Sequence, residues 1–553
     1  MGTELNRRWE SGTHAYSVSD PFGQGPLPWL RSPDQYLAGA EGAVPWYVSV
    51  DAPGQRPLAA GARPKPPVGT PQSANDVDQQ IKGFASAGVI RPGGSVDFRV
   101  TVNPPREFTV DVYRIGHYGG DGASHMTSSP LIAGLAQPAP LVVERTVSCH
   151  HWWHSWRLQI PVHWKPGAYV AVLTTADMLH RSHIPFTVRD FEDREHAAEL
   201  LLVVPDVTWQ AYNLFPEDGR SGASLYHAWD GRGGLVGEPE AAVTVSFDRP
   251  HATAGLPLHV GHAYDFIRWA ERYGYDLSYA TATDLHAGLV DPGRHRALIF
   301  PGHDEYWSEP MRRAVEQARD DGTSLVFLSA NTMYWRVELT AAPSGEPNRL
   351  LNCRKRQKVR PGSPAAGVSG SASALWRDAG EPEQHVLGLQ YSGRVAAPVP
   401  LIARHTAHWL WDGTGLQEGD ELPGLVAGEA DRYYPKVALP EHTERVLLAH
   451  SPYQDLAGRT RYQETSLYRA PSGAYVFAAG TFAWSPALGR PGLTDERIQR
   501  ATANLLDRLG KNEASLGRIE ASLGRNGASL GRNGASLGRN GASLGRKRGL
   551  GGS

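Results

Sequence analysis

Four side chains that can carry acid–base or metal chemistry follow one another in the sequence: His303, Asp304, Glu305 and Tyr306. They come directly after the apolar run 297–300 and a Pro-Gly pair. Because Pro and Gly end strands, this polar group should lie just past the carboxyl end of a buried strand. Ligands bind at that position in open α/β sheets. We therefore interpret the stretch as the centre of a functional site.

We adopt a catalytic role as the hypothesis for three residues, His303, Glu305 and Asn331. His303 could act as a general base or orient a carboxylate, and it could instead bond the backbone of its turn. Glu305, like Asp304, could bind a metal ion or cap the helix expected near residue 309. Asn331 follows another predicted strand, where its amide could hold a substrate carbonyl or satisfy its own loop.

The elements that would position these residues alternate between strand and helix. Residues 262–274 and 309–322 have apolar residues at helical spacing and end on glycine. With buried strands around them, this alternation predicts a parallel, helix-flanked sheet that resembles the sheet of class I amidotransferases. The exit loops of such a sheet should converge at one edge, and they are residues 212–213, 283–284, 303–307 and 331–335.

A nucleophile of the amidotransferase or serine hydrolase kind is not expected in this sheet. The turn G-H-D-E-Y contains no cysteine, and no G-x-S-x-G motif stands at a strand end. The sequence also lacks a Gly-rich phosphate loop. The chemistry is therefore expected to depend on carboxylates, imidazole and phenols rather than on a covalent intermediate.

The rest of the chain divides by composition. Segments 89–102, 166–175 and 183–188 alternate apolar and polar residues between turn signals, which is typical of a β-sandwich. The expected fold class is therefore α/β plus all-β. The expected parts are a Pro/Gly-rich arm at 1–75, a β-sandwich at 76–192, an α/β domain at 193–510 and a low-complexity tail at 511–553. The tail repeats A-S-L-G-R, and we expect it to be disordered and dispensable.

The bulk properties exclude several classes of partner. A net charge of −2 over 553 residues does not favour nucleic acid or an anionic membrane surface. Two cysteines cannot build a disulfide framework, and the N-terminus has no apolar signal core. No apolar run approaches the length of a membrane span. We expect a soluble, cytoplasmic protein.

Several of these motifs resemble the C-terminal domain of the N,N-dimethylformamidase large (beta) subunit family. The resemblance covers roughly residues 80 to 510 and includes the segment before that domain. The pieces that carry it are T-W-Q-A-Y-N (208–213), W-A-E-R-Y-G-Y-D (269–276), G-H-D-E-Y-W-S (302–308), A-N-T-M-Y-W-R-V (330–337), G-E-A-D-R (428–432) and G-T-F-A-W-S (480–485).

The resemblance implies a hydrolase that cleaves the C–N bond of a small linear amide. It also implies a mononuclear ferric iron, held by two tyrosinates and one glutamate, that polarises the amide carbonyl. Our assignment of the ligands is Tyr306, Tyr334 and Glu429. Rivals are Tyr212 and Tyr264 for the second phenolate and Glu305 for the carboxylate. A small accessory subunit and a homo-oligomer are the partners that we expect beside the amide substrate.

The alternative hypothesis is a carbohydrate- or surface-binding protein with an inactive α/β domain. It rests on the segment C-H-H-W-W-H-S-W at 149–156, whose Trp152, Trp153 and Trp156 could bind sugar rings. The histidines could bind zinc. However, adjacent His150 and His151 would face opposite sides of a strand, so a zinc site is disfavoured.

Overall fold

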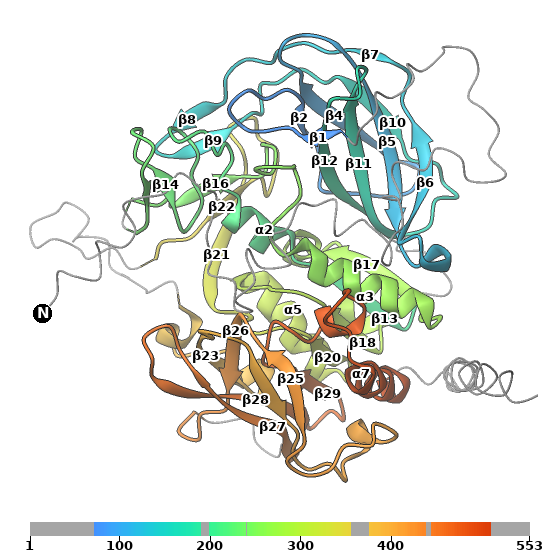
Figure 1. Ribbon diagram of the computed structural model, residues 1–553, viewed down its shortest axis with the longest axis vertical. Coiled ribbons are helices and arrows are strands. Elements are labelled where there is room, and N and C mark those ends of the chain that lie inside the picture. The colour runs from blue at the N-terminus through green and yellow to red at the C-terminus, as the bar shows by residue number, and fades with distance from the viewer. Residues whose placement is uncertain (1–70, 190–197, 239, 356–374, 438–443, 510–553) are drawn as a thin grey trace, which may run out of the picture.

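The computed structural model describes residues 71–189, 198–238, 240–355, 375–437 and 444–509 (Figure 1). Most of the predicted arm and the whole repeat tail lie outside these residues. The predicted boundary near residue 192 also lies outside them, within 190–197. The chain forms mixed α/β and all-β structure, as the sequence predicts.

The N-terminal part consists of two sheets that share one core, drawn in blue and cyan in Figure 1. Strand β4 illustrates why it folds this way, because Val96, Phe98 and Val100 are buried and alternate with polar residues. The larger sheet contains β1 (Gln72–Ser73), β3 (Val89–Ile90), β5 (Glu107–Ile115), β6 (Ala123–Ser128), β7 (Ile132–Ala133), β11 (Gly167–Thr175) and β12 (His180–Val188), and the smaller sheet contains β2 (Lys82–Ala85), β4 (Ser95–Thr101) and β10 (Trp156–Gln159).

A seven-stranded sheet forms the centre of the molecule. Its strands in spatial order are β17 (Leu277–Thr281), β13 (Leu200–Val204), β18 (Ala297–Phe300), β20 (Ser324–Phe327), β29 (Tyr475–Ala478), β28 (Thr460–Arg469) and β27 (Glu444–Gln454). The first five are parallel, as predicted. The last two are antiparallel additions, because tight connections such as the turn at 470–474 can only join antiparallel neighbours. The likeness to class I amidotransferases remains a prediction.

Helices cover both faces of the parallel strands. In β13, Leu200, Leu202 and Val204 pack into the core that contains α3 (Val260–Arg272) and α7 (Glu496–Leu509). The alternate residues Leu201 and Val203 pack into the core that contains α4 (Ala282–His286) and α5 (Glu309–Asp320). A strand buried on both faces reads as a continuous apolar run, which explains the sequence L-L-L-V-V.

Two segments that we expected to be loops are helices. Residues 206–212 form α2 (Asp206–Tyr212), and the exit of β17 forms the short helix α4. Among the described residues, no helix has the length and apolar character needed to cross a membrane. A cytoplasmic location remains a prediction.

The remaining elements are short and lie around the central sheet. The small strands are β8 (Leu141–Val143), β9 (Thr146–Ser148), β14 (Ala228–Trp229), β15 (Leu235–Val236), β16 (Thr244–Ser246), β19 (Tyr306–Ser308), β21 (Trp335–Thr340), β22 (Leu350–Asn352), β23 (Gln390–Arg394), β24 (Val399–Ile402), β25 (Glu421–Val426) and β26 (Glu429–Arg432). The short helices are η2 (Tyr118–Gly120), η3 (Pro292–Arg294), η5 (Trp376–Ala379), α6 (Gln384–Leu387), η6 (Trp409–Trp411) and η7 (Pro486–Leu488).

Candidate active site

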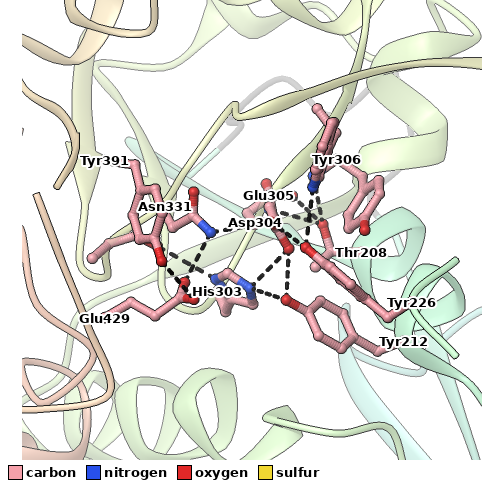
Figure 2. A network of polar contacts seen from close by, with 12 residues as sticks. Thr208, Tyr212, Tyr226, His303, Asp304, Glu305, Tyr306, Asn331, Tyr391 and Glu429 are labelled. Carbon is pink, nitrogen blue, oxygen red and sulfur yellow. Dashed lines mark hydrogen bonds and ion pairs between the residues drawn. The ribbon is translucent and has the colours of Figure 1, made fainter. Parts of the chain in front are cut away.

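A polar cluster lies where three neighbouring parallel strands end. Strand β18 is followed by His303 to Tyr306, β13 by helix α2, and β20 by Asn331. The side chains of these three exits are joined by hydrogen bonds (Figure 2). The convergence follows from the parallel topology, because all carboxyl ends lie on one edge of the sheet.

Thr208 on α2 fixes the turn that carries the cluster. Its hydroxyl accepts hydrogen bonds from the backbone N–H groups of Glu305 (3.0 Å) and Tyr306 (3.1 Å). It also lies 3.0 Å from Oδ1 of Asp304, to which it donates. The side chain is 2% exposed, so these contacts are made without competition from water. One hydroxyl therefore holds three consecutive residues, Glu305 and Tyr306 through their backbone and Asp304 through its side chain.

The buried carboxylate of Glu305 is the centre of the cluster. Tyr212 donates to its Oε2 at 2.6 Å, and Tyr226 donates to its Oε1 at 2.5 Å. In Figure 2 the two phenols approach Glu305 from the same side. His303 Nε2 lies 3.3 Å from Oε2 of Glu305 and 3.0 Å from the Tyr212 hydroxyl. The rings of Tyr212 and Tyr226 are packed 4.9 Å apart.

Asn331 joins Glu305 to a second carboxylate. Its Nδ2 donates to Oε1 of Glu305 at 3.1 Å and to Oε2 of Glu429 at 2.9 Å. Its backbone N–H donates to Asp431 at 2.8 Å, so Glu429 and Asp431 point to the same face of β26, as their spacing predicted. Asn331 has a φ of 54°, a left-handed conformation that Asn tolerates better than most residues. Tyr391 also approaches Glu429, at 3.5 Å.

The two carboxylates and the imidazole differ in their tendency to hold protons. Burial disfavours the charged form of His303, but the hydrogen bond and charge of Glu305 outweigh it and raise the pKa of His303. Burial likewise acts to raise the pKa of Glu305, and the contact with His303 lowers it overall. The pKa of Glu429 is raised by burial, with a contribution from the charge of Glu305. Glu305 is therefore the ionised member and Glu429 the better proton acceptor.

The three central phenols are held in their neutral form. Burial, followed by the charge of Glu305, raises the pKa values of Tyr212 and Tyr226 well above the ordinary range. Burial and the nearby Tyr226 do the same for Tyr306. The Tyr306 hydroxyl is buried and makes no hydrogen bond of normal geometry with a described residue. An unpaired buried hydroxyl calls for an explanation, and a bound ion or water would supply its missing partner.

Lys355 is the cation that faces these phenols. Its Nζ lies 3.3 Å from the centre of the Tyr226 ring and 4.5 Å from that of Trp335. It forms an ion pair with Glu238 at 3.4 Å. Burial lowers the pKa of Lys355, and the charge of Glu305 opposes this effect. The ammonium group and His303 are thus the cations that balance the acids of the cluster.

Asp304 and Asp431, the aspartates next to the cluster, have structural roles. Burial raises the pKa of Asp304 to about 7 and that of Asp431 to about 7. Neither Asp304 nor Glu305 caps α5, because Ser308 accepts the hydrogen bond of Met311 N there. Asp304 therefore supports the turn through Thr208, whereas the carboxylate of Glu305 makes its contacts within the cluster.

Hydrogen bonds join the predicted catalytic residues directly or through one another, whereas the three predicted metal ligands make no such contact with each other. No hydrogen bond or ring contact joins any two of Tyr306, Tyr334 and Glu429 among the described residues. The Tyr334 ring packs instead against Tyr391 and lies under Arg377. Burial raises the pKa of Tyr334 to about 12.

Of the rival ligands, Tyr212 and Glu305 lie in the cluster and Tyr264 does not. Tyr264 lines a separate cavity behind α2. The sequence predicts no role for Tyr226. Its loop has no strand or helix periodicity, and it lies 79 positions from Glu305 in the chain, so only the folded structure brings the two together. Thr208 and Lys355 escaped notice for the same reason.

The tryptophans of the alternative hypothesis do not form an exposed platform. Trp152 is 1% exposed and belongs to a small core, and Trp156 stacks on Phe98. Only Trp153 of the three is exposed. Cys149 is buried beside Trp152, and no group of three or more His, Cys, Asp or Glu residues suited to a metal ion occurs in the described part of the chain.

Comparison with known proteins gives a consistent match to one family. The model of the N,N-dimethylformamidase beta subunit-like, C-terminal family matches residues 109–498, more than half of the chain. The N,N-dimethylformamidase beta subunit of Paracoccus aminophilus is 25% identical over 290 residues, or 45% of this chain and 36% of that protein. The beta subunit from an Alcaligenes species is 24% identical over the same shares. The match thus spans about a third of the length of these curated relatives.

One solved structure also overlaps weakly. It is that of the Pseudomonas fluorescens alkylpurine DNA glycosylase AlkC bound to DNA containing an abasic site analog. The TM-score is 0.13 with 16% identity, over 20% of this chain and 30% of that chain. An overlap of this size carries no argument about fold or function.

Proposed function

Because the chain belongs to the N,N-dimethylformamidase beta subunit-like, C-terminal family, we propose that it hydrolyses the C–N bond of a small amide at the Glu305 cluster. The observation that carries this proposal is the meeting of two phenols, a carboxylate, an imidazole and an amide at the ends of neighbouring strands. The named relatives, which are amidase subunits, support the same reaction class.

A metal ion is part of this proposal, and we assign its ligands to Tyr212, Tyr226 and Glu305. The donor set fits a ferric ion, because phenolate and carboxylate oxygens are hard ligands. Both phenol oxygens already lie within 2.6 Å of the same carboxylate, and the Tyr306 hydroxyl beside them has no normal partner. When bound, such an ion would act as a Lewis acid on the amide carbonyl. This assignment replaces the ligand set expected from the sequence, which was Tyr306, Tyr334 and Glu429.

The chain's own residues would orient the substrate and move the protons. Asn331 Nδ2, between two carboxylates, can donate to a substrate carbonyl oxygen once either carboxylate moves aside. Glu429 can take a proton from the attacking water and pass it to the leaving nitrogen as the C–N bond breaks. His303 holds Glu305 in its ionised form. The aromatic rings of Tyr212, Tyr226 and Trp335 limit the water that reaches these groups.

Partners and location belong to the same proposal. The relatives are named as beta subunits, and we propose that this chain also works in an oligomer or with a small accessory subunit. The cytoplasm is the compartment that we propose.

An assay of amine release tests the reaction. The iron-loaded chain would be incubated with N,N-dimethylformamide, formamide and acetamide. We expect hydrolysis of at least one amide, and a loss of about 100-fold or more in Glu305→Gln. Glu316→Gln is the matched control, because Glu316 is ion-paired with Arg312 on α5. An active Glu305→Gln variant, or no amide cleaved by the loaded wild type, would contradict the proposal.

A further inference from the structure

A second cavity lies between the β-sandwich and the central sheet, on the other side of α2 from the Glu305 cluster. Thr208 and Tyr212 face the cluster, whereas Trp209 and Gln210 line the cavity. Residues two apart on a helix point in different directions, so α2 separates the two spaces. Tyr264, which does not join the cluster, also lines this cavity.

The walls of the cavity are apolar and aromatic on the sandwich side and mixed on the other, where aromatic and polar residues alternate with charged ones. Phe84, Ile184 and Phe186 come from the sandwich, and Trp209 and Phe247 from the α/β part. The enclosed volume is about 70 Å³. Since a single water needs roughly 10 to 15 Å³ by this measure, the space would take several waters or one ligand of about five non-hydrogen atoms.

Arg249 lines this cavity and carries a buried positive charge. It is 1% exposed, and its Nη atoms donate to the carbonyl groups of four residues, Gln210, Asn213, Phe215 and Ala223. Its Nε has no hydrogen-bond partner, and no carboxylate pairs with it among the described residues. Burial lowers the pKa of Arg249 to about 9, so the group remains a cation at neutral pH. A buried cation without a counter-charge is costly.

The other titratable groups around Arg249 do not supply that counter-charge. Arg349 is neutralised by Asp248 at 2.6 Å. Burial and the charge of Arg249 lower the pKa of His251 to about 3, which keeps its ring neutral. Both oxygens of Asp206 accept hydrogen bonds from Thr283, and burial raises its pKa to about 6, so it is ionised at neutral pH. It makes no ion pair with Arg249 among the described residues, so no anion lies in direct contact with Arg249.

We propose that this cavity is a second ligand site, which binds a small aliphatic monocarboxylate with its carboxylate at Arg249 and its carbon chain against the aromatic walls. The size of the enclosed space matches propionate. The ligand would contact Trp209 and Gln210 on the helix that also carries Thr208 and Tyr212. The site does not depend on the proposed amidase activity or on a metal ion.

Thermal unfolding in the presence of propionate tests the proposal. The full chain would be measured with sodium propionate, with sodium chloride at equal ionic strength, and with nitroethane, a neutral molecule of the same shape. We expect the melting temperature to rise by about 1 to 3 °C with propionate in a saturable manner, and not with the two controls. No rise with propionate, or an equal rise with nitroethane, would overturn the proposal.

Variants locate the binding. Gly88 is an exposed residue at the edge of the cavity, and a Cβ atom there would meet no atom within 4 Å, so Gly88→Phe can place a ring at the opening. Gly489→Phe is the matched control, because its Cβ also meets nothing and it does not line the cavity. The propionate effect should be lost in Gly88→Phe and in Arg249→Met, and kept in Gly489→Phe.

Arg249→Met removes a group that holds four carbonyls, so it can fail to fold. In that case a crystal structure of the wild type grown with propionate decides the matter. Propionate bound against Arg249 supports the proposal. Propionate found only elsewhere, or a propionate effect that survives in Gly88→Phe, overturns it.

Discussion

At the scale of single residues, the cluster depends on one amide that serves two buried acids. Asn331 is the residue that keeps Glu305 and Glu429 apart, since one NH₂ group donates to both. Two carboxylates this close to one amide repel each other unless a donor or cation lies between them. The strand-end position of Asn331 was visible in the sequence. Its bridging role was not, because Glu429 lies 98 positions away.

Asn331→Asp should therefore be strongly destabilising. The change keeps the shape of the side chain and tolerates the positive φ, but it places a third acid between two carboxylates. We expect the free energy of unfolding at pH 8 to fall by about 3 kcal/mol, and hydrolysis to be lost. Denaturant unfolding measures the first effect. Asn352→Asp is the control, because the Asn352 amide donates to Glu338 O and Thr340 Oγ1 and to no carboxylate. Equal losses in both variants would refute this account of Asn331.

The residues that sequence reasoning could find are those next to a strand end. His303, Glu305 and Asn331 follow β18 and β20 directly, and the turn signals and apolar runs marked those positions. Tyr226 and Lys355 could not be found in this way. They lie in irregular segments, and only the path of the folded chain brings them to Glu305 and Tyr226 respectively.

At the scale of elements, helix α2 is the part that connects the sheet to the cluster. Its sequence D-V-T-W-Q-A-Y contains β-branched and aromatic residues of low helix propensity, which is why we expected a loop. The helix forms because its tertiary contacts stabilise it. Val207 is buried against the sheet, and Thr208 and Tyr212 reach the turn after β18. Longer amphipathic helices such as α3, α5 and α7 were predictable from periodicity alone.

Thr208→Val isolates the contribution of α2. Valine has nearly the same shape, but it leaves two buried N–H groups, of Glu305 and Tyr306, without acceptors. We expect a loss of about 2 to 4 kcal/mol in the free energy of unfolding and a fall in turnover of about 10-fold or more, since Glu305 shifts. The comparison variant is Thr502→Val in α7, whose hydroxyl bonds Trp484 and Ile498. It should lose stability without losing turnover. Unchanged turnover in Thr208→Val would show that α2 does not position Glu305.

At the scale of the whole molecule, several acids are buried without full compensation. The pKa values of Asp206, Asp304 and Asp431 are raised mainly by burial. A carboxyl group whose pKa is higher in the folded state binds more protons when folded. Its stabilising contribution is present below the unfolded pKa and is lost as the pH rises through the folded pKa. The protein should therefore lose stability between about pH 4 and pH 7.

Glu217 allows this pH dependence to be tested away from the cluster. Burial, followed by the charge of Asp76, raises its pKa from 4.5 to about 7. Glu217→Gln should be more stable than wild type by about 1 to 2 kcal/mol at pH 8 and equally stable at pH 4.5. Glu144→Gln changes an exposed glutamate and should alter neither value. A wild-type advantage at pH 8 would show that the sign of this effect is wrong.

The overall architecture was largely accessible from patterns. Period-two alternation marked the sandwich strands, and continuous apolar runs marked the parallel strands. The antiparallel strands β27 and β28 beside β29 were seen only as strand-like pieces, because periodicity does not say which edge a strand joins. The pairing of the small sheets that carry Glu429 and Trp335 was not predicted, because it joins segments that are distant in the sequence.

The iron content of purified wild type, Tyr226→Phe and Tyr334→Phe tests the central claim most directly. We predict about one iron ion per chain in the wild type, with the visible colour of an iron–tyrosinate protein. Tyr226→Phe should lose most of the iron and the colour, because it removes a phenol that reaches Glu305. Tyr334→Phe should keep both, since its ring packs against Tyr391 instead. Wild type without iron, or iron kept in Tyr226→Phe and lost in Tyr334→Phe, would contradict the account.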